Sequence, residues 1–401
     1  MKNRNVKKVN WDAFNDDEKL LEYLKSLPRY KNSSLKSAFW RITFFLKVIH
    51  CHLFKKMDKP LFVVFVTNNK CNLNCRYCYG YYGKRKEHKD YSTKESVKII
   101  DELKDLGTGL LTLHGGESLL RKDIGEIFNY AKLKGFYVSL NTNGYLVPER
   151  IKEIKCLDNI CLSLDGREEN NDKNRGKGCY QKVMKAIEVI VENDLPCVLS
   201  ATLTKDTVDD MEVLAELAET KKCRLQYSIL YNAGELARRH PDIVMSDSEI
   251  REVARQILEL KNRGFPVYYS KNVLAAAIDW PIKYDEKMFL TKNDKEFIKN
   301  RQFVECYHGS LKYQIDADGR VITCWAQDHS HAPNIKTLGV KGAIRQCHEN
   351  NQCRYCAFLA NNEHNALLGL GVKNIINLIG IHIADVIKIK RRLVKKNIHP
   401  S

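Results

Sequence analysis

Apolar runs alternate with helical patterns between residues 61 and 230, and this alternation limits the folds open to the chain more than any other feature. The first run is LFVVFVT at 61–67, and further strand candidates follow at 110–116, 136–144, 159–166, 195–204 and 223–230. Continuous apolar strands joined by helices are typical of a parallel sheet covered by helices. Eight such units would close a full barrel. Six units predict an α/β fold with a partial (β/α)6 TIM-like barrel.

The segments outside the alternation differ from it in composition. Residues 1–60 are basic and include an aromatic-rich helix candidate at 36–57, and residues 231–301 have the mostly helical pattern of a connector or cap. Residues 302–360 hold five cysteines and the turn sequence DADG, and residues 361–401 form an apolar tail that ends in a basic run. We therefore expect helical N- and C-terminal extensions and a small C-terminal α+β domain. The tail is amphipathic and basic.

The chain has a formal net charge of +17 over 401 residues. Nucleic acid, an anionic membrane and an acidic peptide all suit such a charge, so the charge alone selects none of them. The N-terminus is basic but lacks the apolar segment of a secretory signal, which indicates a cytoplasmic protein. Clustered cysteines in a reducing compartment favour metal ligation over disulfides. Scattered cysteines such as Cys161 are interpreted as small buried side chains.

Three cysteines follow the first predicted strand directly. Cys71, Cys75 and Cys78 are spaced C-x3-C-x2-C, at the strand end where parallel α/β folds carry their chemistry. Tetrahedral zinc needs a fourth ligand, and the loop offers no fourth cysteine. A [4Fe–4S] cluster tolerates three thiolates and leaves one iron open to an outside ligand. A zinc knuckle, or thiols grouped by chance, is the alternative.

This loop resembles the signature of the radical S-adenosylmethionine (SAM) superfamily, C-x3-C-x-aromatic-C after the first strand of a partial barrel. Cys71, Cys75, Tyr77 and Cys78 match it position by position. The resemblance implies that SAM binds the open iron and that an electron from the cluster cleaves it. The products are methionine and a 5′-deoxyadenosyl radical, which abstracts hydrogen from a substrate. Tyr77 would pack against the adenine of SAM.

Further residues at later strand ends fit the same resemblance. In the family a Gly-Gly-Glu stretch binds the SAM amino group, later strand ends contact its ribose and carboxylate, and an Arg of an RGxGxF/Y element suits the carboxylate. The residues that the resemblance implies for SAM are Gly115, Gly116, Glu117, Asn141, Ser163, Asp165 and Arg175. His114 stands where the family usually has Thr or Ser, and we interpret it as a turn residue. No acid, base or hydrogen donor is assigned.

A second group of cysteines lies in residues 302–360. Two strand candidates flank DADG, and the hairpin they predict presents thiols near Cys306 and Cys324; Cys353 and Cys356 form a chelating pair. Four cysteines hold a [4Fe–4S] cluster with no open iron, and a four-cysteine zinc ribbon is the alternative. The arrangement resembles the SPASM domain, or its shorter twitch form, and implies one auxiliary cluster. Whether Cys347 replaces Cys353 as a ligand stays open.

Two functions from different classes follow. The first is a radical SAM oxidoreductase or maturase with two [4Fe–4S] clusters, SAM, and an electron donor such as flavodoxin or ferredoxin. Its substrate is a peptide or protein side chain, a lipid or a small metabolite. The second is a non-catalytic iron–sulfur or zinc protein that binds nucleic acid, which the spread of the basic residues disfavours. The apolar, basic segments 36–57 and 364–396 either pack over the barrel or attach it peripherally to the inner face of the membrane.

Overall fold

The computed structural model describes residues 9–14, 16–80, 82, 89–231, 238–298, 303–324, 327 and 329–370. The predicted tail at 361–401 therefore lies mostly outside the described residues. In the described part no helix is long and apolar enough to cross a membrane.

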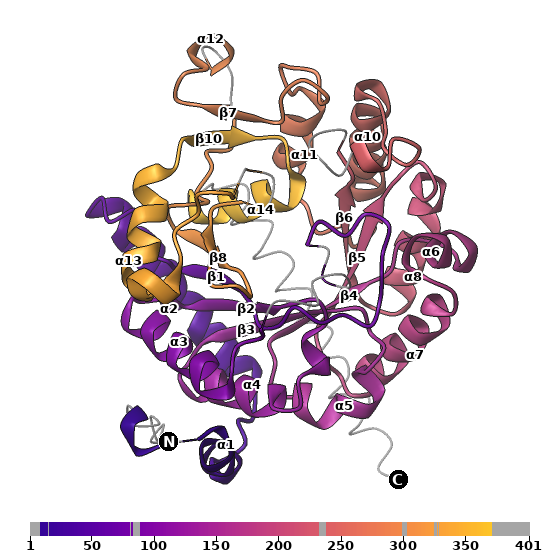
Figure 1. Ribbon diagram of the computed structural model, residues 1–401. Coiled ribbons are helices and arrows are strands. Elements are labelled where there is room, and N and C mark those ends of the chain that lie inside the picture. The colour runs from indigo at the N-terminus through magenta and orange to yellow at the C-terminus, as the bar shows by residue number, and fades with distance from the viewer. Residues whose placement is uncertain are drawn as a thin grey trace.

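A parallel sheet forms the centre of the structure, as the alternation predicted (Figure 1). Its neighbouring strands follow the order β6-β5-β4-β3-β2-β1-β8-β9, and β1 to β6 run parallel in chain order. The six barrel strands are β1 (Phe62–Val66), β2 (Leu110–His114), β3 (Tyr137–Thr142), β4 (Asn159–Ser163), β5 (Cys197–Leu203) and β6 (Arg224–Ile229). The α/β fold with a partial barrel is confirmed, with β6 as one edge of the sheet.

Helices on the outside of the curved sheet alternate with these strands (Figure 1). They are α3 (Thr93–Asp105), α4 (Ile124–Leu133), α5 (Val147–Ile154), α6 (Glu168–Arg175), α7 (Cys179–Glu192) and α8 (Met211–Thr220), with short 3-10 turns at Ser118–Leu120 and Val208–Asp210. Helix α3 begins with a capping box, in which the Ser92 side chain accepts from the Glu95 amide and the Glu95 carboxylate accepts from the Ser92 amide. The sequence signal S-T-K-E predicts this start correctly.

The C-terminal region extends the same sheet. Strand β8 (Lys312–Ile315) pairs parallel with β1, and β9 (Val321–Ile322) turns back against it, so the hairpin around DADG is confirmed. A second, two-stranded sheet joins β7 (Phe289–Thr291) to β10 (Cys353–Cys356). The helices of this half are α10 (Asp247–Asn262), α11 (Lys271–Ile278), α12 (Lys295–Ile298), α13 (Ile335–Asn350) and α14 (Leu359–Leu368).

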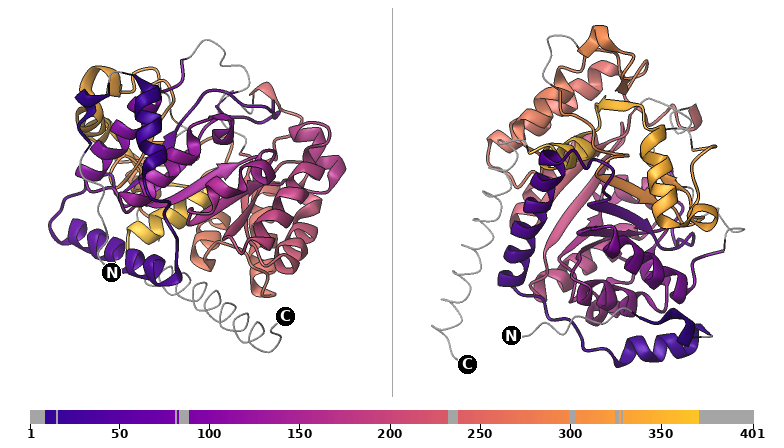
Figure 2. Two further views of the ribbon diagram at one scale, coloured as in Figure 1. Left: turned by 90° about the horizontal axis from the view of Figure 1, so that it is seen from below. Right: turned by 90° about the vertical axis from the view of Figure 1, so that its left-hand side faces the viewer.

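The N-terminal segment contributes a 3-10 turn (Trp11–Ala13), α1 (Asp17–Ser26) and α2 (Ser34–Leu53). One face of α2 packs at the amino ends of the strands, where Phe44, Val48 and Cys51 form a cluster with Leu61 and Leu311. Both helices lie on the outside of the molecule in the views of Figure 2. The helix predicted within 36–57 is therefore present, and α2 covers the amino end of the barrel.

Candidate functional site

The three-cysteine loop lies directly against the turn that follows β2. The amide of Gly116 donates to the Asn68 carbonyl at 3.1 Å, and the amide of Glu117 donates to the Lys70 carbonyl at 2.8 Å. A Cβ at Gly116 would stand 2.3 Å from the Lys70 oxygen and 2.9 Å from the Cβ of Cys71. Glycine is therefore required at this position, because only a residue without a side chain lets the turn support the loop so closely.

All three thiols of the loop are partly buried, and two of them, those of Cys71 and Cys75, have raised pKa values. Burial raises the pKa of Cys71 to about 11 and that of Cys75 to about 12, although the nearby Arg175 opposes the shift at Cys75. These thiols hold their protons at neutral pH, so metal binding must release them. Such soft sulfur ligands suit iron–sulfur clusters and zinc.

The number of ligands separates these two metals. Among the described residues no group of three His, Cys, Asp or Glu side chains is set to hold a single metal ion. A [4Fe–4S] cluster binds each thiolate through a different iron, so three thiolates hold three irons and leave the fourth open. Tetrahedral zinc would need a fourth ligand, which the loop does not supply.

A buried ion pair joins the loop to the ends of β4 and β5. Arg175 donates from Nε and Nη2 to the two carboxylate oxygens of Asp165, both at 2.8 Å, and Asp165 is fully buried. Asp165 also accepts from the Tyr77 hydroxyl and, at 2.9 Å, from the amide of Thr202. The guanidinium lies 5.5 Å from the centre of the Tyr77 ring. Three residues predicted to contact SAM therefore also contact one another.

The carboxylate of Glu117 is occupied by its own chain. It accepts from the amides of Leu119 at 3.0 Å and Asn143 at 2.8 Å, and from the Thr142 hydroxyl at 2.9 Å. Burial raises the pKa of Glu117, and these donors oppose the shift. The side chain thus ties the end of β2 to the end of β3, which leaves the backbone of the Gly-Gly-Glu turn as the part free to approach a ligand.

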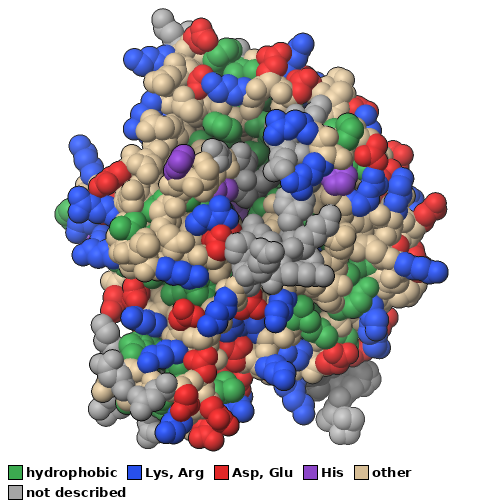
Figure 3. Space-filling model, in the orientation of Figure 1, with side chains coloured by type: hydrophobic (Ala, Val, Ile, Leu, Met, Phe, Trp, Pro, Cys, Tyr) green, Lys and Arg blue, Asp and Glu red, His purple; other side chains and the backbone are tan. Residues whose placement is uncertain are grey.

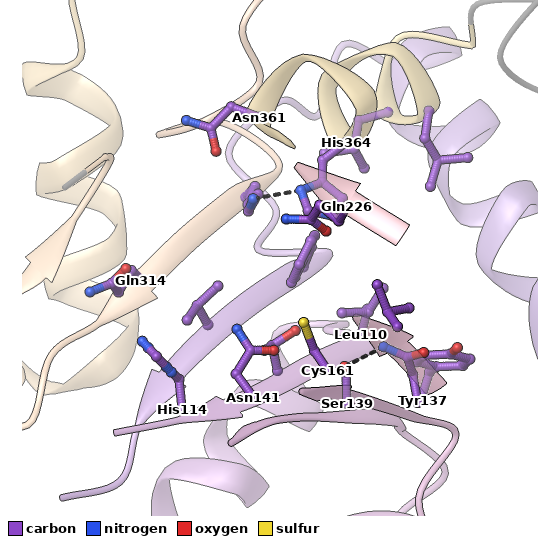
Figure 4. A pocket seen from close by; sticks show the side chains of 18 of the residues that line it. Leu110, His114, Tyr137, Ser139, Asn141, Cys161, Gln226, Gln314, Asn361 and His364 are labelled. Carbon is purple, nitrogen blue, oxygen red and sulfur yellow. Dashed lines mark hydrogen bonds between the residues drawn. The ribbon is translucent and has the colours of Figure 1, made fainter. Parts of the chain in front are cut away.

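A cavity of about 730 Å³ fills the interior of the barrel (Figure 4). In closed barrels the inward-pointing side chains pack in layers and fill this space. Here one layer of paired positions is Val64, Thr112, Ser139 and Asn159, and the next includes Asn141 and Cys161. These inward side chains line the cavity and leave its space open. The volume lies within the range of small-molecule sites.

The cavity reaches from the carboxyl ends of the strands to the helices at their amino ends. His114 and Asn141 line it at the carboxyl end, and Ser163 at the end of β4 does not line it. Residues of α2 and α14, including Trp40, Ile42 and Leu367, line it at the other end. Cys161, which the sequence suggested was a buried packing residue, lines the cavity instead, because it lies on an inward position of β4.

Basic side chains give the cavity its charge. Arg41, Arg224 and Lys312 line it together with His114, His308 and His364, and none of the described lining residues is Asp or Glu. The ammonium of Lys312 is buried and lies 3.0 Å from Nδ1 of His364. Burial lowers the pKa of Lys312 to about 8. The sequence did not indicate that these residues come together. Only Arg224 on β6 and Lys312 on β8 carried a local signal, which was their position within predicted strands.

His114 differs from the turn residue expected. It ends β2, its Nε2 lies 3.0 Å from the Tyr79 hydroxyl, and its buried Nδ1 has no hydrogen-bond partner among the described residues. Burial lowers the pKa of His114 to about 4, so the ring is neutral at physiological pH. A neutral imidazole with one open nitrogen at a cavity wall can accept or donate a hydrogen bond to a bound molecule.

The second group of cysteines converges on one small pocket. Cys306, Cys324, Cys353 and Cys356 all line it, although they come from different segments: Cys353 and Cys356 from β10, and Cys324 from the chain after β9. Cys347 is not among its lining residues and lies on α13 in the main hydrophobic core. Cys324 also lines the barrel cavity, so the pocket and the cavity share a wall. This geometry favours Cys353 over Cys347 as the fourth ligand.

The fold and the loop together define a class of proteins: partial α/β barrels whose first strand leads into a three-cysteine loop. Residues 65–218 match the family model described as the Radical SAM superfamily. This match runs from β1 to α8 and identifies the barrel of the chain as a radical SAM domain.

The chain matches curated relatives over about half of its own length and half of theirs. The chain is 32% identical over 228 residues to the Fe-coproporphyrin III synthase of Methanosarcina barkeri, which is 54% of this chain and 56% of the relative. It is 29% identical over 202 residues to the mycofactocin maturase MftC of Mycolicibacterium smegmatis, covering 49% and 51% of the two chains. The chain thus spans about half the length of these relatives.

Solved structures share the fold over most of the chain. Streptococcus suis SuiB bound to the precursor peptide SuiA covers 83% of this chain and 77% of its own at 15% identity, with a TM-score of 0.58. Native anSMEcpe with bound AdoMet covers 79% of this chain and 99% of its own at 16% identity, with a TM-score of 0.54. These likenesses extend beyond the barrel and confirm the expected architecture, a partial barrel with a small SPASM-like C-terminal domain.

Proposed function

We propose that Cys71, Cys75 and Cys78 hold a [4Fe–4S] cluster whose fourth iron binds SAM. Bound there, the cluster would supply one electron, taken from an external donor of the flavodoxin or ferredoxin type, to split SAM into methionine and a 5′-deoxyadenosyl radical. The radical takes a hydrogen atom from a substrate and becomes 5′-deoxyadenosine. The observation that carries this proposal is the cysteine loop, set at the carboxyl end of β1 beside a cavity that continues through the barrel.

The chain's own residues prepare this site for SAM. The Gly115–Gly116 backbone packs closely against the loop, and its polar groups suit the amino group of SAM, while Tyr77 offers its ring to the adenine. Asp165 accepts from the Tyr77 hydroxyl, Arg175 holds that carboxylate with two hydrogen bonds, and the remaining guanidinium nitrogen of Arg175 suits the SAM carboxylate. Asn141 and Ser163 stand at the neighbouring strand ends for the ribose.

The four thiols of the second pocket suit an auxiliary [4Fe–4S] cluster. Cys306, Cys324, Cys353 and Cys356 saturate the four irons, so this cluster passes electrons and has no open iron. Because Cys324 also lines the barrel cavity, an electron left on a substrate radical has a short path to it. Cys347 takes no part.

The substrate lies in the barrel cavity and carries an anionic group. Three basic side chains and no acidic ones line the described wall, so an anionic group in the cavity would balance their charge. A carboxylate on a peptide side chain or on a small metabolite meets this requirement. The relatives of the chain include an AdoMet-dependent heme synthase of Methanosarcina barkeri and a PqqA peptide cyclase of Granulibacter bethesdensis.

Anaerobic reconstitution tests the proposal. The holoprotein should bind about eight irons per chain and release 5′-deoxyadenosine from SAM only when a reductant is present. Cys75→Ala should abolish release and retain about four irons. In the auxiliary pocket, Cys353→Ala should lose about four irons, while the matched Cys347→Ala should keep all of them. Reductant-independent release, or iron loss in Cys347→Ala, would contradict the assignments.

A further inference from the structure

Helix α2 is apolar on two faces, and the structure covers only one of them. The inner face packs Phe44, Val48 and Cys51 against the barrel. The outer face leaves five large apolar side chains in solvent, at relative exposures of 84% for Leu35, 70% for Phe39, 61% for Ile42, 58% for Leu46 and 73% for Leu53. Soluble surface helices carry one apolar stripe, and a second stripe marks a helix that meets another apolar phase.

The outer residues follow a regular spacing. Leu35, Phe39, Ile42 and Leu46 are separated by four, three and four positions, and Leu53 continues the stripe two turns later. Such spacing aligns the side chains along one line on the helix surface. The stripe is therefore a single continuous surface, which we call the outer stripe of α2.

Acidic residues are absent from the sequence around this stripe. Between Glu22 and Asp58 the chain has no Asp or Glu, and its basic residues are Lys25, Arg29, Lys31, Lys36, Arg41, Lys47, Lys55 and Lys56. Lys36 lies beside the stripe, Lys55 and Lys56 lie just beyond its end, and all three are exposed. The surface thus combines exposed apolar side chains with a purely cationic border.

This charge selects among the partners that could cover the stripe. A second copy of α2 would bring two cationic borders together. The segment 371–401 carries seven Lys and Arg residues against one Asp, so it too would add like charge. An anionic lipid surface offers both an apolar layer and the opposite charge.

We propose that α2 binds an anionic lipid bilayer and lies in its interface, with the outer stripe inserted among the acyl chains and the lysines on the headgroups. Ile42 and Leu46 belong to the stripe and also line the barrel cavity. The membrane surface would therefore lie next to the amino end of the cavity. This attachment is peripheral and is independent of the radical chemistry.

Sedimentation of the reconstituted holoprotein with vesicles tests the proposal. We expect binding to phosphatidylcholine vesicles that contain phosphatidylglycerol, weak binding to pure phosphatidylcholine, and release as salt is raised, since salt screens the headgroup charge. The double variant Phe39→Ser/Leu53→Ser should weaken binding at least about tenfold, because insertion scales with buried apolar area. Neither residue lines the cavity, so release of 5′-deoxyadenosine should not change.

Two further variants make the result specific. Leu338→Ser removes an exposed leucine outside the outer stripe, at 46% exposure on α13. This control variant should bind vesicles as tightly as the unmodified protein does. The triple variant Lys36→Gln/Lys55→Gln/Lys56→Gln should lose the preference for phosphatidylglycerol. Equal binding to both vesicle types, unchanged binding of the double variant, or a protein dimer that the double variant dissociates would overturn the proposal.

Discussion

The pair of Arg175 and Asp165 gives the sharpest stability prediction. Asp165 is fully buried, Arg175 is 8% exposed, and the guanidinium donates two hydrogen bonds to the carboxylate. In Asp165→Ala the positive charge of Arg175 stays buried without its partner, and the Thr202 amide loses its acceptor. Removing one member of a buried pair costs about 3–5 kcal/mol, so we expect the free energy of unfolding to fall by that amount.

Urea unfolding of the metal-free protein measures this change, with tryptophan fluorescence as the signal. Glu153→Ala is the matched control, because Arg150 and Glu153 form a similar two-bond pair that is partly exposed, at 18% and 30% of their side chains. Such pairs contribute about 1 kcal/mol or less. The double variant Asp165→Ala/Arg175→Met should recover part of the loss, because the unpaired charge is removed. A loss below about 1 kcal/mol in Asp165→Ala would refute the reasoning.

Three further predictions follow from the site. Gly116→Ala should displace the cysteine loop, since its Cβ would stand 2.3 Å from the Lys70 carbonyl oxygen; the reconstituted protein should then lose about four irons, whereas the helical Gly342→Ala should keep them. Burial lowers the pKa of His114 to about 4 in the folded protein. On acidification, His114 therefore becomes protonated in the unfolded chain at a higher pH than in the folded protein. Stability should therefore fall by up to about 1 kcal/mol per pH unit from pH 6.5 toward 4, and His114→Phe should flatten this slope in unfolding curves. Arg224→Gln should weaken binding of the anionic dye anilinonaphthalenesulfonate several-fold and leave binding of the neutral N-phenylnaphthylamine unchanged, and equal effects on both dyes would rule out charge recognition.

Local signals in the sequence predicted the barrel well. Apolar strands, capping boxes such as Ser92 with Glu95, and glycines such as Gly107 and Gly135 that end helices with positive φ all act over a few residues. The cysteine loop was equally readable because its residues are adjacent in the chain. The hairpin of β8 and β9 followed from its turn sequence.

Features that depend on distant partners could not be read in this way. Strand β10 carries Cys353 and Cys356 and forms only by pairing with β7, more than 60 residues earlier in the chain. The roles of Cys161 and Lys312 depend on which face of the sheet encloses the cavity. The sequence did not distinguish Cys347 from Cys353 as a ligand. The structure does, because β10 places Cys353 in the pocket of the other three thiols, whereas Cys347 lies on α13 and does not line that pocket.

Basic residues illustrate the same limit. The net charge of +17 follows from the sequence, but its location on the molecule does not. On the face drawn in Figure 3 the Lys and Arg side chains are spread among acidic ones and do not form a single stripe, which does not favour the nucleic-acid alternative. Residues 23–57 have eight basic and no acidic side chains, and the described cavity wall has three Lys and Arg side chains and no acidic ones.

The central claim is that the loop of Cys71, Cys75 and Cys78 leaves one iron open to SAM. Electron paramagnetic resonance of the reduced Cys306→Ala/Cys353→Ala variant tests it most directly, because this variant removes the auxiliary ligands and keeps the loop. We predict a single [4Fe–4S] signal whose g values change when SAM is added. A signal that SAM leaves unchanged, or one that is absent from this variant and present in Cys75→Ala, would contradict the account.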